Sequence, residues 1–265
     1  MKGFKIYDLR FKTLSSNNKI KNKLKQRAGK IWSFFVDLLF PIECLDCGRE
    51  GEWLCAGCFL KIKIVDRQVC QGCGRFGLNG AVCSHCKPDW ALDRVLAALD
   101  YDRMIPAKLI KTLKYGFVKD VSLVLAKIFL KFYHSSKLQG LVPDFGGRRI
   151  IFIPVPLHPK RLRWRGFNQS ELIARPIAQA LGGELLNGVL IRAKNVLPQT
   201  KFKGAERLKN IEGCFKFIGE ANQIKGKIVI LVDDVITTGA TMNECAKALK
   251  LAGAKKVWGF AIARG

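Results

Sequence analysis

Eight of the ten cysteines in this chain lie between residues 44 and 86, in four C-x₂-C pairs that read "CLDC", "CAGC", "CQGC" and "CSHC". Each pair can present two thiolates to one ion, and two pairs complete the closed tetrahedral S₄ site typical of structural zinc. Four pairs therefore predict a small module that folds around two structural Zn²⁺ ions. In the simplest arrangement the ligands of the first site are Cys44, Cys47, Cys55 and Cys58, and those of the second are Cys70, Cys73, Cys83 and Cys86.

Disulfides are the main alternative for these cysteines, and a redox dithiol is a weaker one. Paired C-x₂-C motifs in a cytosolic chain are more typical of metal binding, and four copies within 43 residues are not typical of a redox dithiol. The pairing of cysteines between the two sites stays open. His85 lies inside the last pair and could replace one thiolate, with a bystander as the favoured alternative.

After the cysteines, apolar strand-like runs alternate with helical patterns to the end of the 265-residue chain. Continuous apolar strands separated by helices are typical of a parallel sheet covered on both faces. We therefore expect an α/β fold and three parts: a basic tail with a short amphipathic helix (1–40), a zinc-ribbon module (41–90) and an α/β domain (91–265). The expected strands cover 93–102, 149–155, 227–234 and 255–264, and the expected helices cover 104–116, 121–133, 168–183 and 240–253.

The strand "KIVILVDD" runs directly into the small, hydroxyl-rich stretch "VITTGAT". Ligands of open α/β sheets bind at the carboxyl ends of strands, which places Asp233 and Asp234 at the rim of such a site. Backbone N–H groups and threonine hydroxyls at a helix start can hold a phosphate, and two carboxylates beside them suit vicinal ribose hydroxyls. The alternative is an ordinary strand–turn–helix in which Thr238 or Thr241 is the N-cap.

The stretch "VILVDDVITTGAT" resembles the phosphoribosyl-pyrophosphate motif of type I phosphoribosyltransferases. Three further segments resemble the ComF family of competence-associated, phosphoribosyltransferase-like proteins: "IPVPLHPKRLRWRGFNQSELIA", "AALDYD…LIKTLKYG" and "LPQTKFKGAERLKNIEGCF". In the last of these, Gln199, Arg207 and Asn210 stand at recognisable positions of the family's hood segment. The resemblance covers roughly residues 35–265 and leaves the basic tail outside.

This resemblance implies a type I phosphoribosyltransferase-like parallel sheet flanked by helices, preceded by a double zinc ribbon. It implies that Asp233 and Asp234 bind ribose hydroxyls and that Mg²⁺ accompanies the pyrophosphate, near the loop after "IFIPVPL". The residues implied for the 5′-phosphate are Thr237, Thr238, Gly239, Ala240 and Thr241. The family acts in DNA uptake and natural transformation, so single-stranded DNA and uptake helicase or channel proteins are the implied partners.

The resemblance supplies neither an acceptor base nor a catalytic residue, so whether the chain is an enzyme stays open. The alternative function is a metabolic phosphoribosyltransferase that moves ribose 5-phosphate from phosphoribosyl pyrophosphate to a nucleobase or amine. A third possibility is a ligand-sensing adaptor in which nucleotide binding tunes protein contacts.

Basic residues outnumber acidic ones by 46 to 21, and 36 against 20 remain when the tail 1–30 is set aside. Such an excess favours a polyanionic partner, although a lysine-rich proteome would also produce it. On the segment 148–165 we assign Arg165 to the small ligand, and Arg161 and Arg163 to a longer polyanion. Trp164, together with Phe167, is expected to stack unpaired bases of single-stranded DNA.

Lys108, Lys111 and Lys114 recur every third residue, so we expect them to share one helix face. They are candidates for nucleic-acid contacts, with a plain solvated face as an equal alternative. The most apolar early run, "IWSFFVDLLFPI", is shorter than the ~20 residues of a membrane span and is interrupted by Asp37. It also lacks the small-residue cleavage site that a signal peptide would have. We therefore expect no membrane span and a cytoplasmic location.

Overall fold

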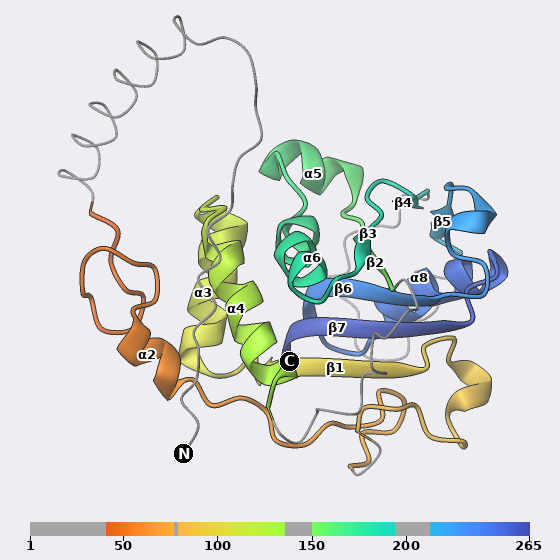
Figure 1. Ribbon diagram of the computed structural model, residues 1–265, viewed down its shortest axis with the longest axis horizontal. Helices are drawn as coiled ribbons and strands as arrows, with labels where there is room; N and C mark the ends of the chain where they lie inside the picture. Colours follow the sequence, from red (N-terminus) through yellow and green to blue (C-terminus); the bar gives the residue numbers. More distant parts are fainter. Residues whose placement is uncertain (1–40, 77–78, 136–149, 194–212) are drawn as a thin grey trace, which may run out of the picture.

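A five-stranded parallel sheet organises the computed structural model, which describes residues 41–76, 79–135, 150–193 and 213–265 (Figure 1). The strand order is β1-β7-β6-β2-β3, and a separate antiparallel pair is formed by β4 and β5. The strands are β1 (Arg94–Asp100), β2 (Ile151–Pro154), β3 (Glu184–Leu185), β4 (Leu190–Arg192), β5 (Phe215–Phe217), β6 (Ile228–Ile236) and β7 (Lys256–Arg264). The tail, the helix expected before Pro41, and the hood residues Gln199, Arg207 and Asn210 lie outside the described residues.

Helices cover both faces of the sheet. The α-helices are α2 (Ala56–Lys61), α3 (Met104–Tyr115), α4 (Val121–Tyr133), α5 (Pro159–Arg165), α6 (Gln169–Ala180) and α8 (Ala240–Leu251), and the short 3₁₀ helices are η1 (Lys87–Asp89) and η3 (Ala221–Gln223). Helices α3, α4 and α6 share one core with the sheet, and α8 shares the other. The parallel α/β fold predicted from the sequence is thus confirmed.

Strand β6 shows why the apolar runs of this chain form buried strands. Successive side chains of a strand point to opposite faces of the sheet. Ile230 and Val232 pack in the core with α3, α4 and α6, whereas Val229 and Leu231 pack in the core with α8. A strand covered on both faces needs apolar residues at every position, which accounts for the unbroken run.

The start of α6 matters for the site because it lies beside the end of β6. Asn168 caps the helix, and its side-chain oxygen accepts a hydrogen bond from the backbone N–H of Ser170 at 3.1 Å. Glu171, which has capping-box spacing, pairs instead with Arg175 at 2.8 Å. Pro176 lies buried inside this helix, although a proline in its sequence could also have marked the first turn of a helix.

No helix in the described part of the chain is both long enough and apolar enough to cross a lipid bilayer.

Candidate ligand and metal sites

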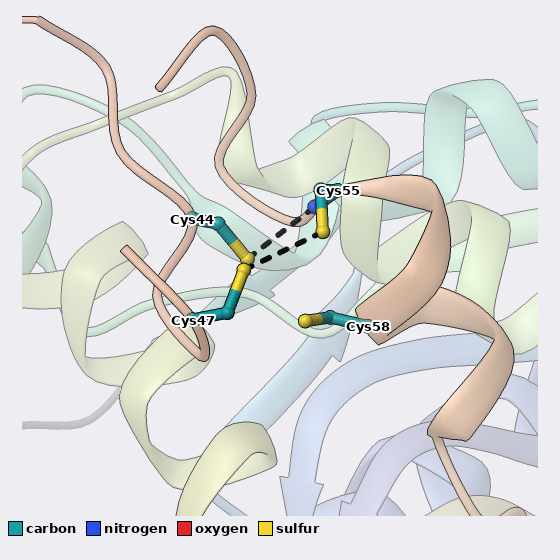
Figure 2. Close-up of side chains that lie close together, drawn as sticks. All are labelled: Cys44, Cys47, Cys55 and Cys58. Carbon is teal, nitrogen blue, oxygen red and sulfur yellow. Dashed lines mark hydrogen bonds between the residues drawn. The ribbon is translucent and has the colours of Figure 1, made fainter. Parts of the chain in front are cut away.

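The eight clustered cysteines form two groups of four, in the pairing expected from their order. Within each group the Sγ atoms all lie within 4.8 Å of one another, and Figure 2 shows Cys44, Cys47, Cys55 and Cys58 converging in this way. The Sγ atoms of Cys47 and Cys55 are 3.7 Å apart. Two sulfurs bound at ~2.3 Å to a tetrahedral zinc ion are separated by ~3.8 Å. Both groups therefore fit closed S₄ zinc sites, as a double zinc ribbon requires.

The two groups also share their backbone geometry. In the first, the backbone N–H of Cys55 points at the Sγ of Cys44 at 3.4 Å; in the second, the N–H of Cys83 points at the Sγ of Cys70 at 3.4 Å. Burial would raise the pKa of Cys44, but the backbone N–H groups around its sulfur outweigh burial and lower it to about 6. Because the thiolate is the form that binds metal, this environment favours coordination.

The segment that carries the first group of cysteines, called the first ribbon below, is attached to the sheet domain through α4. The ammonium of Lys131 donates hydrogen bonds to the backbone carbonyls of Phe59, Leu60 and Ile62, at 3.1, 3.1 and 3.2 Å. These carbonyls lie at the end of α2, where a cation complements the helix dipole. The first ribbon thus packs against α4 by a polar anchor as well as by apolar contacts.

Asp234 lies near the carboxyl end of β6, on the face that carries α3 and α6. Its carboxylate is buried, forms an ion pair with Lys114 of α3, and accepts a hydrogen bond from Gln169 Nε2 of α6 at 3.0 Å. Burial alone would lower the pKa of Lys114, but the neighbouring carboxylates raise it. Asp234 thus lies at the carboxyl end of the strand, as expected, but two helices cover its carboxylate, so it is buried there.

Asp233 is half-buried and accepts two hydrogen bonds through Oδ1, from Ser170 Oγ at 2.8 Å and from the backbone N–H of Asp234 at 2.9 Å. Burial and the adjacent Asp234 carboxylate raise the pKa of Asp233 to about 7. The two carboxylates thus have different environments. The charge of Asp234 is compensated by the ammonium of Lys114, whereas Asp233 has a pKa close to neutral pH.

Lys114 is consequently placed differently from the other two lysines of its predicted face. Lys108 is exposed and donates to the backbone carbonyl of Leu45 in the first ribbon at 3.3 Å, and Lys111 is exposed. The ammonium of Lys114 forms an ion pair with Asp234. We therefore assign Lys114 to the site around Asp233 and Asp234, called the acidic site below, and not to nucleic-acid contacts.

Arg165 is buried at the end of α5 and connects to the acidic pair through Gln169, whose Oε1 accepts a hydrogen bond from Arg165 Nη1. Its guanidinium lies 5.8 Å from the ring centre of Tyr115. Its Nε is buried and has no hydrogen-bond partner among the described residues. A buried donor without a partner is costly, and an anionic ligand would satisfy it.

The loop after β6 runs from Thr237 to Gly239, and α8 begins at Ala240. Gly239 is the N-cap residue with φ +77°, a left-handed conformation that favours glycine. Thr238 Oγ1 accepts a hydrogen bond from the Ala240 N–H at 3.4 Å, but Gly239 is the N-cap, so the alternative in which Thr238 or Thr241 is the N-cap is wrong. Thr237 and Thr238 are exposed and Thr241 is partly exposed, which leaves hydroxyls available to a ligand.

Helix α5 presents an exposed basic and aromatic surface. Arg161, Arg163 and Trp164 are exposed, and the Trp164 ring contacts Phe117 edge-on with ring centres 5.2 Å apart. Tyr115 adds a third exposed ring, 6.2 Å from Trp164. Phe167 is only 8 % exposed and packs in the core, so the expectation that it stacks bases is wrong.

The sequence reasoning missed three side chains of the acidic site: Gln169, Ser170 and Lys114. The first two were indicated by the polar "NQS" run at the expected start of a helix, and the structure buries both side chains against the two aspartates. Nothing local in the sequence indicated that Lys114 pairs with a residue 120 positions away.

Comparison with known families agrees with both halves of the chain. The family model described as a double zinc ribbon domain matches residues 35–87, and the phosphoribosyl transferase domain model matches residues 169–263. The second match contains the acidic pair, the loop and the start of α6.

Three curated relatives resemble the chain over most of its length. "Competence protein F" of Haemophilus influenzae is 29 % identical over 238 residues, which cover 84 % of this chain and 98 % of the relative. "Competence protein ComFC" of Bacillus subtilis is 30 % identical over 224 residues, covering 82 % and 86 % respectively. "DNA utilization protein YhgH" of Escherichia coli strain K12 is 28 % identical over 221 residues, covering 81 % and 92 %.

Proposed function

Since this chain belongs to the ComF family of competence proteins, we propose that it binds phosphoribosyl pyrophosphate with Mg²⁺ at the end of β6, and single-stranded DNA along α5, during DNA uptake. The observation that carries the first part is the Asp233–Asp234 pair beside the loop that opens α8. The names of the relatives support the second part, because they refer to competence and to DNA utilization.

The acidic site has the donor set that a sugar phosphate needs. The half-buried Asp233 is available to ribose hydroxyls, which are good partners for a carboxylate. The loop offers the hydroxyls of Thr237 and Thr241 and the N–H groups at the start of α8 to the 5′-phosphate. Among the residues that the structure describes, none accepts a hydrogen bond from the Arg165 Nε–H, which is therefore available to a pyrophosphate oxygen.

Magnesium fits the same site chemically, because Mg²⁺ is usually held by one or two carboxylates together with substrate phosphates. Asp233 is the better candidate ligand, since Asp234 is already paired with Lys114. The metal would offset the charge of the pyrophosphate, while Asp233 and the loop orient the ribose.

Support for DNA binding comes from the exposed face of α5. Arg161 and Arg163 supply positive charge there, and Trp164 with its neighbours Tyr115 and Phe117 supplies a cluster of exposed rings. Stacking of unpaired bases on such rings is tolerant of sequence. Helicase and channel proteins of the uptake machinery remain the proposed protein partners.

The deciding experiment titrates the purified chain with phosphoribosyl pyrophosphate and Mg²⁺, and with a fluorescent single-stranded oligonucleotide, separately and together. Asp233→Asn should weaken sugar-phosphate binding by about 10- to 100-fold, because a hydrogen bond to a charged group contributes ~1.5–3 kcal/mol. Asp93→Asn should not, because Asp93 lies at the amino ends of β1 and β7, at the opposite end of the sheet from the loop.

Each part fails on a separate result. If the wild-type chain binds no phosphoribosyl pyrophosphate, the ligand part is wrong; if it ignores oligonucleotides at ~50 mM salt, where phosphate contacts are strongest, the DNA part is wrong. Pyrophosphate release with any member of a panel of nucleobases or amines would establish the transferase alternative.

A further inference from the structure

The second cysteine ribbon contacts the loop that follows β6. The contact is made by Gln71, which lies between the ligands Cys70 and Cys73. Its Nε2 donates a hydrogen bond to the backbone carbonyl of Thr237 at 2.8 Å, across 166 positions of the sequence. A residue in the turn of one cysteine site therefore reaches the first residue of the proposed phosphate loop.

A second partner fixes the orientation of the Gln71 amide. Its Oε1 accepts a hydrogen bond from Arg264 Nη1, at the end of β7, at 2.8 Å. Arginine can only donate and a carbonyl can only accept, so these two partners determine which end of the amide faces the loop. Glutamate could keep the Arg264 contact but would place a second acceptor against the Thr237 carbonyl.

The fit of this side chain against the loop is close. A Cβ built on Gly239 would lie 2.6 Å from Gln71 Cγ and 3.0 Å from Gln71 Cδ. The loop glycine therefore has two reasons to lack a side chain: its φ of +77° and the approach of Gln71. Because both ends of Gln71 are held by hydrogen bonds, it cannot move aside without losing them.

We infer that Gln71 is a positioning residue of the phosphate loop, so that the second cysteine ribbon forms part of the ligand site. The ribbon keeps the loop in one conformation, and Thr237, Thr238 and Gly239 present their donors without first being ordered. Binding to a loop that is already ordered avoids an entropic cost. The expected effect of Gln71 on ligand affinity rests on the function proposed above, whereas its role in holding the loop does not.

The first test therefore needs no ligand. Hydrogen exchange would be followed at the amides of Ala240 and Asn243, which bond to Thr238 Oγ1 and to the Gly239 carbonyl. Gln71→Ala should speed their exchange by about 2- to 10-fold, the effect of one neutral hydrogen bond. Ser84→Ala is the matched control: Ser84 is exposed between two ligands of the same ribbon, and exchange should stay at the wild-type rate.

The second test measures affinity for phosphoribosyl pyrophosphate with Mg²⁺. Gln71→Ala should weaken it by about 2- to 10-fold, and Gln71→Glu by more, because the variant adds a negative charge beside the phosphate. Zinc content is measured for every variant, and Gln71→Met replaces Gln71→Ala if the latter loses metal.

Wild-type exchange rates in the zinc-loaded Gln71→Ala and Gln71→Glu variants would overturn the inference. Failure of the wild-type chain to bind phosphoribosyl pyrophosphate would instead overturn the proposed ligand, and the exchange result would still decide whether Gln71 positions the loop. Faster exchange with unchanged affinity would confine the role of Gln71 to the free chain and refute its part in the ligand site.

Discussion

Replacing Asp233 by asparagine should stabilise the folded chain above neutral pH while weakening its binding of phosphoribosyl pyrophosphate. The pKa of this carboxyl is about 7 in the folded chain, against ~3.9 for an aspartate in water. Between about pH 4 and pH 7 the unfolded chain has therefore released a proton that the folded chain retains, so stability falls as pH rises. Above pH 7 the carboxyl is ionised in the folded chain as well, and the free energy of unfolding is lowered by the full cost of that ionisation.

The size of the effect follows from that difference. About 3 pH units at ~1.4 kcal/mol each give ~4 kcal/mol as an upper limit. Asparagine keeps a side-chain oxygen that can accept from Ser170 Oγ and from the Asp234 N–H. The pKa of about 7 already includes the attraction between Asp233 and Lys114. The amide of asparagine brings two N–H donors that need acceptors of their own, so we expect a net gain of ~1–3 kcal/mol at pH 8 and about half of it at pH 5.5.

Thermal unfolding of wild type and variant at the two pH values measures this gain, at ~2–4 °C per kcal/mol for a chain of this size. Asp93→Asn is the opposite control, because Lys250 and Lys87 outweigh burial and lower the pKa of Asp93. Its stabilising contribution is complete above about pH 4, so this variant should be equally destabilised at both values. A variant Asp233→Asn that is less stable than wild type at pH 8 would refute the reasoning.

Three further predictions follow from the metal, the buried ion pair and the basic helix. The purified chain should contain about two Zn²⁺, and chelation should lower its melting temperature because closed S₄ sites hold such modules folded; elemental analysis without zinc, with eight free thiols in folded protein, would contradict this. Lys114→Met should cost ~3–5 kcal/mol by leaving the Asp234 carboxylate buried and unpaired, and adding Asp234→Asn should recover much of the loss, whereas Lys111→Met should change stability by less than ~0.5 kcal/mol. Replacing Arg161 and Arg163 by alanine should reduce the slope of log affinity against log salt for oligonucleotides by about one to two; the same double change at the exposed Lys255 and Lys256 is the control, and an equal reduction there would mean that α5 is not the contact surface.

Much of the fold could be predicted because its signals are local. The first five residues of β6, 228–232, are apolar at every position, and a strand covered on both faces requires such a run. Cysteine order gave the correct grouping because each ribbon closes between neighbouring pairs. The glycine at 239 could be placed at the start of a helix for a similar reason, since its left-handed φ is a property of the turn itself.

The parts that could not be predicted depend on contacts between distant segments. A three-residue spacing shows that Lys108, Lys111 and Lys114 share a face of α3, but not that the end of that face reaches Asp234. Trp164 and Phe167 are close in sequence, yet Gly166 ends α5 with φ +76° and turns the chain, so that one ring is exposed and the other is buried. The contact of Gln71 with Thr237 spans 166 positions.

The positions of the basic residues distinguish two proposed kinds of anion binding, of a sugar phosphate at the acidic site and of an oligonucleotide on α5, which the net charge of the chain does not distinguish. Lys114 and Arg165 are shielded from solvent and directed at the acidic site, where salt screens charges only weakly. Arg161 and Arg163 stand in solvent on α5, where a Debye length of ~8–10 Å at moderate salt limits their reach. Salt should therefore weaken oligonucleotide binding far more than sugar-phosphate binding. Because Arg165 ends the same helix that carries Arg161 and Arg163, one short element brings the two proposed sites together.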